Sequence, residues 1–202
     1  MRVAVLASGE GTNLQALLDQ AHGREGIEIA AVASDKPEAR ALERARRAGV
    51  ETAVFELDEY VDRLARDRAM ASWLRSRSVD LVVLAGYMQL LSQEFLGLFP
   101  GRIINVHPAL LPAFPGLRAV EQALDYGVKV FGVTVHFVDQ GIDTGPVILQ
   151  RAVEVNDAQS ADDVFERLHP IEHELLPEAV RLIARGAVRI DPERPRRVIV
   201  ER

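Results

Sequence analysis

The sequence contains no cysteine, which excludes disulfide bonds, thiol nucleophiles and cysteine-ligated zinc. It has no run of about 18 or more apolar residues, and its apolar N-terminal stretch is too short for a signal peptide, so no membrane partner is expected. The net charge is -6, which argues against a nucleic-acid partner and leaves local donors to bind any anionic ligand. These absences together predict a cytoplasmic protein.

The composition that remains is that of a globular protein. The 202 residues are 48% hydrophobic and 27% charged, which is typical of one domain with a full core. No internal repeat or linker interrupts the chain. We therefore predict a single domain over residues 1–202, with the polar stretch 191–202 as a peripheral tail. No interface pattern decides between a monomer and a homodimer.

Short β-branched runs alternate with helical patterns through the first hundred residues. This alternation predicts a mostly parallel, twisted sheet covered on both faces, which is a Rossmann-like three-layer α/β sandwich. The predicted strands are 2–7, 27–33, 52–55, 81–85 and 102–106, and the predicted helices are 13–22, 37–48 and 58–77. Pro37 is placed at the first turn of the second helix and Gly49 at its end.

The C-terminal half shows a different pattern. Two longer apolar runs, 129–138 and 147–155, are separated by a Gly/Asp/Pro loop and are expected to add an antiparallel strand. Apolar residues then keep helical spacing over 161–184. Pro170 and Pro177 fall inside that segment, so we expect a kinked or divided helix.

A glycine-rich turn, residues 8–13, joins the first predicted strand to the first predicted helix. Three interpretations compete: a plain tight turn, a dinucleotide site, or a cradle for one phosphate. Asp35 lies near the offset of a ribose-binding acid, but Leu14 replaces the third glycine that a dinucleotide site requires. We favour one phosphate, bound by Gly11, Thr12 and Asn13.

An amide and an imidazole lie two residues apart at the end of a predicted strand. Asn105 and His107 therefore project to one face, at the sheet edge where ligands bind in open α/β folds. With the carboxylate of Asp143, they have the chemistry to stabilise an oxyanion and move a proton. The plain alternative is that Asn105 caps a turn and His107 is an ordinary histidine. His136 is expected to be structural, and no spacing of ligands predicts a metal site.

Two segments, 103–112 (IINVHPALLP) and 136–146 (HFVDQGIDTGP), resemble the folate-dependent formyltransferases, and the resemblance extends from Val3 to about Val188. It implies transfer of the formyl group of 10-formyltetrahydrofolate to an amine, with Asn105, His107 and Asp143 as catalytic residues. Asp143 would raise the pKa of His107 by its opposite charge. The one-domain length is most similar to the branch that formylates glycinamide ribonucleotide in purine biosynthesis.

The resemblance also implies where each substrate binds: a nucleotide half at about 1–100 and a folate and catalytic half at about 101–190. The implied nucleotide contacts are Gly11, Thr12, Asn13, His169 and Glu172. The implied folate contacts are Arg63, Met88, Gln89, Leu90, Leu91, Asn105, Val138, Asp139, Gly141 and Asp143. Without the family, Arg63 and Glu172 would pass for ordinary solvated charges.

The chain departs from the family pattern at two places. Gln89 stands where the family commonly has arginine, and Val120 stands near where a histidine is often present in a mobile loop. Leu111-Pro112 is a candidate for the cis peptide that the family uses to shape its site.

Three other functions remain as alternatives. A formyl-folate hydrolase normally has an extra N-terminal domain, which we do not expect because the first predicted strand begins at Arg2. Methionyl-tRNA formyltransferase has a C-terminal tRNA-binding domain, which the acidic charge and the short tail disfavour. A non-catalytic nucleotide-binding protein would use the glycine turn alone.

Overall fold

Strands and helices alternate in the first of two units, Met1–Ile104, in a computed structural model that describes residues 1–201. The strands are β1 (Arg2–Leu6), β2 (Glu28–Ser34), β3 (Glu51–Val54) and β4 (Leu81–Leu84). β1 pairs in parallel with β2 and β4, and β2 pairs in parallel with β3. These strands are almost continuously apolar because helices cover both faces of a parallel sheet.

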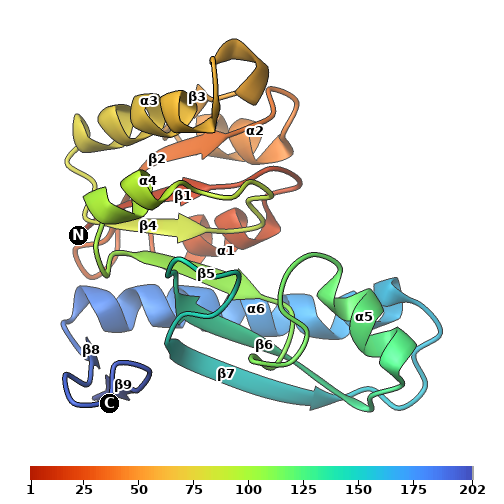
Figure 1. Cartoon of the computed structure of the whole chain (residues 1–202). Helices are drawn as coiled ribbons and strands as arrows, with labels where there is room; N and C mark the ends of the chain where they lie inside the picture. The colour runs from red at the N-terminus through yellow and green to blue at the C-terminus, as the bar shows by residue number, and fades with distance from the viewer. Residues whose placement is uncertain (202) are drawn as a thin grey trace. The chain divides into compact units, whose positions relative to one another are not determined.

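The helices of this unit are α1 (Thr12–Gln20), α2 (Arg40–Arg47), the 3-10 turn η1 (Leu57–Glu59), α3 (Arg63–Arg75) and α4 (Gln93–Leu98). Right-handed crossovers from β1 to β2 to β3 put α1 and α2 on one face of the sheet. The crossovers through α3 and α4 run in the opposite direction and use the other face. Accordingly, α1 packs on α2 and α3 packs on α4 (Figure 1).

The second unit, Asn105–Arg202, contains the antiparallel part of the sheet. Its elements are the end of β5 (Ile103–His107), α5 (Ala119–Tyr126), β6 (Val130–Phe137), β7 (Val147–Glu154), α6 (Ala161–Ala184), β8 (Val188–Ile190) and β9 (Val198–Val200). β6 and β7 pair antiparallel, and the apolar side of α6 packs on both. The strand order is β3-β2-β1-β4-β5-β6-β7, which confirms the Rossmann-like sheet and its antiparallel addition.

Two predicted helix starts are wrong. α2 begins at Arg40 rather than at 37, because Pro37 lies in a turn and Ala39 has extended backbone angles (φ -59°, ψ 122°). The predicted helix 58–77 is two elements, since the chain leaves η1 and α3 starts again at an N-cap. There the Asp62 carboxylate accepts a hydrogen bond from Ala65 N at 2.7 Å. Gly49 follows the end of α2 with φ 72°, as predicted.

The expected division of the last long helix is also wrong. α6 runs without interruption through Pro170 and Pro177. Ser160 and Asp163 form a reciprocal capping box at its start, and packing on β6 and β7 holds the rest. The sequence patterns missed α4 and α5, and they missed the β8–β9 hairpin, whose second strand lies in the predicted tail.

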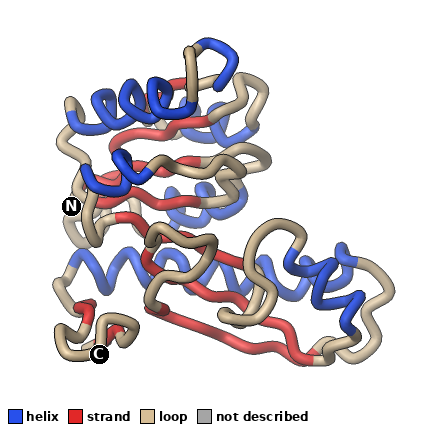
Figure 2. The backbone as a smooth tube through the Cα atoms, in the orientation of Figure 1, coloured by secondary structure: helices blue, strands red, loops and turns tan. Residues whose placement is uncertain are grey.

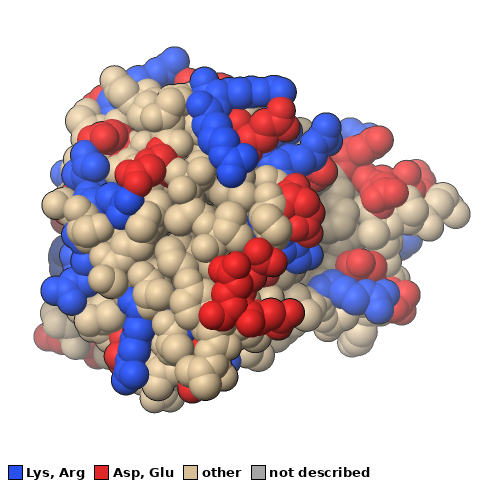
Figure 3. Space-filling view, turned by 90° about the horizontal axis from the view of Figure 1, so that it is seen from above, with Lys and Arg blue, Asp and Glu red and all other residues tan. Residues whose placement is uncertain are grey.

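Acidic and basic side chains are interspersed on the face shown in Figure 3. Within residues 1–201, no helix is long and apolar enough to cross a bilayer.

Close packing explains the glycine at position 11. Gly11 has φ 71°, and a Cβ there would lie 2.7 Å from Ala41 Cα on α2. A Cβ at Gly9, two residues earlier, would have no neighbour within 4 Å. Gly11 is therefore required by the left-handed backbone and by contact with α2, whereas Gly9 is not required by either.

We expect Gly11→Ala to lower the free energy of unfolding by about 1–3 kcal/mol, because it adds left-handed strain and overpacks α2. Gly9→Ala is the matched control and should change it by about 0.5 kcal/mol or less. Urea unfolding of both variants measures the difference, and equal stability of the two would contradict this account.

Candidate active site

The first backbone N–H groups of α1 lie in the turn where β1 leads into this helix. Gly11 is the N-cap of α1 in a left-handed conformation and supplies no side-chain cap. The first helical hydrogen bond runs from Gln15 N to Gly11 O at 2.9 Å, so the N–H groups at the start of the helix have no acceptor within it. The N–H groups at a helix start attract anions because they lie at the positive end of the helix dipole. Gly11, Thr12 and Asn13 thus lie together at the place that the phosphate interpretation requires.

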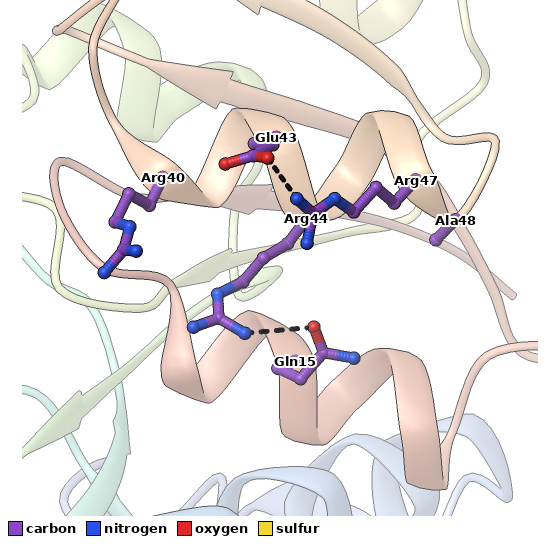
Figure 4. A pocket seen from close by; sticks show the side chains of 6 residues that line it. All are labelled: Gln15, Arg40, Glu43, Arg44, Arg47 and Ala48. Atoms are coloured by element: carbon purple, nitrogen blue, oxygen red, sulfur yellow. Dashed lines mark hydrogen bonds and ion pairs between the residues drawn. The ribbon is translucent and has the colours of Figure 1, made fainter.

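Helix α2 holds this turn through hydrogen bonds to its backbone carbonyl groups. Ala41 N donates to Gly9 O at 3.1 Å, and Arg44 Nε donates to Glu10 O at 2.8 Å. Arg44 also contacts Gln15 Oε1 on α1 at 3.2 Å, across a hollow of about 450 Å³ that arginines of α2 line (Figure 4). In a trans peptide the carbonyl and the next N–H point in opposite directions. The Arg44 contact therefore turns the Gly11 N–H away from α2.

The loop after β4 presents apolar side chains outward. Met88 is 55% exposed and Leu90 is 56% exposed, while Gln89 between them turns inward and donates to Asp35 Oδ2 at 3.0 Å. The loops that follow β1 and β4 lie side by side (Figure 2). A hydrogen bond joins them, because Met88 N donates to Ser8 Oγ at 2.8 Å. The side-chain amide of Gln89 is therefore engaged in a hydrogen bond within the protein. The family-implied Arg63 is exposed at the first residue of α3.

The three residues predicted to be catalytic lie together in the second unit. Asn105 Nδ2 donates to Asp143 Oδ1 at 3.1 Å, and His107 Nδ1 lies 3.3 Å from Asp143 Oδ2. Asn105 and His107 reach one carboxylate because alternate residues of β5 face the same side. Asp143 itself adopts φ 52°, a conformation that is uncommon outside glycine and that recurs at functional sites.

The ring of His107 faces an acceptor at each nitrogen. Nδ1 faces the Asp143 carboxylate, and Nε2 lies 2.8 Å from the carbonyl oxygen of Phe114. An imidazolium satisfies both contacts by donation, whereas a neutral ring can donate in only one of them.

Asp143 stays ionised far below neutral pH. Burial alone would raise its pKa, but other effects outweigh it: a hydrogen bond with His136, the Gly116 N–H at 2.8 Å, and the charges of His107 and His136. Together they lower the pKa of Asp143 to about 2. The carboxylate is therefore a fixed negative charge and a weak proton acceptor at neutral pH.

Sequence patterns placed His136 among structural residues, yet it belongs to this cluster. Its Nε2 lies 3.3 Å from Asn105 Nδ2 and 3.5 Å from Asp143 Oδ1, while its Nδ1 faces Phe137 O at 2.8 Å. The Nδ1 atom must donate to that carbonyl, so Nε2 accepts from Asn105 in a neutral ring or donates to Asp143 in a charged one. The sequence could have indicated this, because Thr134 and His136 are polar residues at alternate positions of an otherwise apolar strand, and therefore face the same side.

Thr134 anchors the segment that follows His107. Its hydroxyl donates to Ala109 O at 2.7 Å and accepts from Leu111 N at 3.2 Å and from Gln150 Nε2 at 2.8 Å. One donor and two acceptor sites are all that a hydroxyl has, so the group is fully satisfied. The Leu111-Pro112 peptide in this segment is cis.

Hydrogen bonds between its own residues fix the conformation of the loop that contains Asp143. Asp139 Oδ1 accepts from Gly141 N at 3.0 Å and from Thr144 Oγ1 at 2.5 Å, so this carboxylate organises the loop. Gly145 packs so closely that a Cβ would lie 1.7 Å from Phe137 O. Val138 is partly exposed and Ile142 is 54% exposed, which leaves apolar surface beside the carboxylate cluster.

The two nucleotide contacts implied on α6 are less exposed than a solvated helix surface would be. Glu172 is 6% exposed, so its interpretation as a solvated helix glutamate is wrong. His169 stacks between Phe165 and His173, with ring centroids 5.4 and 6.0 Å apart, and burial lowers the pKa of His169. Among residues 1–201, no group of three or more His, Cys, Asp or Glu side chains is arranged to hold a metal ion.

The geometry agrees with comparisons to known proteins. Residues 1–180 match the formyl transferase family model, so the chain belongs to the formyl transferase family. It is similar to phosphoribosylglycinamide formyltransferase of Bacillus subtilis, at 41% identity over 89% of this chain and 93% of that protein. The crystal structure of glycinamide ribonucleotide transformylase 1 from Symbiobacterium toebii is 50% identical, with a TM-score of 0.95, over 100% of this chain and 94% of that one.

A longer relative matches over a smaller share of its own length. The chain is 43% identical to the human trifunctional purine biosynthetic protein adenosine-3 over 94% of this chain, which is 19% of that protein.

The pKa of Asp143 predicts how stability varies with acid. Its folded pKa of about 2 lies below the ordinary 3.8, so the stabilisation is complete above about pH 4 and is lost as the pH falls toward 2. We expect Asp143→Asn to be less stable than the wild type by about 2 kcal/mol at pH 5, and the difference to shrink by pH 2. Urea unfolding between pH 5 and 2 measures it.

Asp125→Asn, at an exposed carboxylate on α5, is the control and should follow the wild type throughout. A gap between wild type and Asp143→Asn that is constant across this pH range would show that the carboxylate is not held in its ionised form.

Proposed function

We propose that this protein transfers the formyl group of 10-formyltetrahydrofolate to the amine of glycinamide ribonucleotide, giving the N-formyl product of purine biosynthesis. The convergence of Asn105 and His107 on the Asp143 carboxylate carries the proposal. The relatives named for formyl transfer to this nucleotide, in Bacillus subtilis and Symbiobacterium toebii, support the choice of substrate.

The reaction joins the amine nitrogen to the formyl carbon and breaks the bond from that carbon to N10 of the folate. The tetrahedral intermediate has a negative oxygen, to which the Asn105 amide and the His107 imidazolium donate. For His107, this donation replaces its contact with Phe114 O. The amine loses one proton and N10 gains one, so the step needs proton transfer but no net acid or base.

The low pKa of Asp143 implies different roles for Asp143 and His107 in the reaction. A carboxylate with a pKa of about 2 is a poor proton acceptor at neutral pH, so Asp143 serves to orient the His107 ring and to place a negative charge beside it. The imidazole, which commonly transfers protons near neutrality, relays the proton with water. Asp143 therefore acts chiefly by charge rather than as the base.

We assign the nucleotide phosphate to the N–H groups at the start of α1 and to the Thr12 hydroxyl. His169 and Glu172 contact the rest of the nucleotide. The folate lies against the apolar side chains of Met88 and Leu90 and the backbone of 88–91. The remaining folate contacts are Arg63, Asn105, Val138, Asp139, Gly141 and Asp143.

This function fits one formyltransferase domain in the cytoplasm that acts on small molecules, without metal, nucleic acid or membrane partners, as a monomer or homodimer. A formyl-transfer assay with both substrates tests the activity. Separate titrations with folate and nucleotide test the alternative of a nucleotide-binding protein, for which only the nucleotide would bind.

We expect Asn105→Ala and His107→Ala each to lower turnover by about a hundredfold or more, the effect of losing one oxyanion donor. Asn156→Ala, at an exposed asparagine after β7, is the control and should keep wild-type turnover. Thermal unfolding of each variant checks that the fold is kept. Wild-type turnover in folded His107→Ala would rule out the mechanism.

We expect Thr12→Val to weaken binding of glycinamide ribonucleotide by about tenfold or more, because a hydrogen bond to a charged phosphate is lost. Folate binding by the same variant should change little. Calorimetry with each substrate separates the two effects, and a variant that loses folate but keeps nucleotide affinity would contradict the phosphate assignment.

A further inference from the structure

An arginine that is fully buried on α3 stands out from the other charged residues. Arg66 is 0% exposed and is the largest fully buried side chain among residues 1–201, and its neighbour Asp67 is 1% exposed. Arginine is almost never buried unless its charge is paired and its donors are bound. Here Arg66 Nε and Nη2 contact Asp67 Oδ1 at 2.9 and 2.7 Å.

The remaining donors of Arg66 reach the loop after β4. Nη1 donates to Gln89 Oε1 at 3.3 Å, and Nη2 donates to the carbonyl oxygen of Leu90 at 3.2 Å. Asp67 completes the attachment, because its Oδ2 accepts from Ser92 N at 2.6 Å. The buried pair thus binds both a backbone carbonyl and a backbone N–H of one loop.

Gln89 is oriented by a charge on each side. Its Nε2 donates to Asp35 Oδ2 at 3.0 Å, while its Oε1 accepts from the Arg66 guanidinium. Rotating the amide by half a turn would place its donor against the cation and its acceptor against the carboxylate, so only one orientation is satisfied. Asp35 is itself 8% exposed, so the carboxylate in this contact is buried.

We propose that Arg66, together with Asp67, is a positioning residue that sets the backbone of the loop 88–92 and so presents Met88 and Leu90 to the folate. The part concerning folate rests on the proposed function, whereas the positioning of the loop rests on the hydrogen bonds alone. The guanidinium fork is required, because one ammonium group cannot span Asp67, Gln89 and Leu90 O at once.

The test compares Arg66→Lys with Arg68→Lys, two residues further along the same helix. Arg68 is 60% exposed and pairs with Glu94 through Nε at 2.7 Å and Nη2 at 2.9 Å, so it links α3 to α4 without touching the loop. Both variants keep the charge and lose the fork. The difference between them therefore isolates the buried attachment of the loop.

Hydrogen exchange without any ligand measures the loop itself. In Arg66→Lys we expect the amides of 88–92 to exchange about tenfold faster or more than in the wild type, while β1 and β4 stay protected. Arg68→Lys should leave the exchange of 88–92 within about twofold of the wild type. Unchanged exchange in a folded Arg66→Lys would overturn the proposal.

Kinetics then connects the loop to the substrate. Arg66→Lys should raise the KM for formyl folate by about tenfold or more and leave kcat and the KM for the nucleotide within about threefold, because misplaced contacts weaken only the ligand they serve. Equal increases in both KM values would indicate a general loss of structure and would overturn it. If the wild type binds no folate, the proposed function fails, and hydrogen exchange still decides the positioning.

Gln89→Leu is the second variant, for the case in which Arg66→Lys does not fold. It removes the bridge between Asp35 and Arg66 and leaves the buried pair with Asp67 intact. We expect faster exchange at 88–92 and a KM for formyl folate raised by about threefold or more. Wild-type values for both would overturn the proposal.

Discussion

The second unit depends on one constraint, that a largely buried carboxylate must be surrounded by donors. The Asp143 side chain is 13% exposed and meets the Gly116 N–H, the Asn105 amide and the His107 ring. Asn105 and His107 lie on β5, Gly116 lies in the segment after it, and Asp143 lies in the loop after β6, so one charge organises three parts of the chain. Without the charge the buried His107 ring would lose the acceptor at its Nδ1, which is unfavourable in a medium of low dielectric constant.

In the first unit, arginine side chains bind the backbone carbonyl groups of two loops. Arg44 holds the turn after β1 through Glu10 O, and Arg66 holds the loop after β4 through Leu90 O. In both cases a guanidinium on a helix binds a carbonyl of a loop that has no strand partner there. Loops at the carboxyl ends of parallel strands are where ligands bind, and side-chain anchors keep such loops ordered without extending the sheet.

Membership of the formyl transferase family and the arrangement of the cluster support the same chemistry from independent directions. The family match covers residues 1–180, while the cluster is defined by distances between side chains. The low pKa of Asp143 adds what a family match cannot, because it identifies the carboxylate as an ionised group and a weak proton acceptor at neutral pH. At Gln89 the neighbouring cation is the buried guanidinium of Arg66, which donates to Gln89 Oε1.

Local patterns in the sequence were enough for the strands of the seven-stranded sheet, for four of the helices and for the alternation of Asn105 with His107, because periodicity and β-branching act over a few residues. They were not enough for the start of α2, where a turn at Pro37 precedes the helix, or for α6, where packing overrides two prolines. Only the tertiary structure decided that His136 joins Asp143, that Gly11 is required by Ala41, and that Arg66 is buried. The physical reason is that desolvation and the choice of a partner depend on segments far apart in the chain, which no local pattern records.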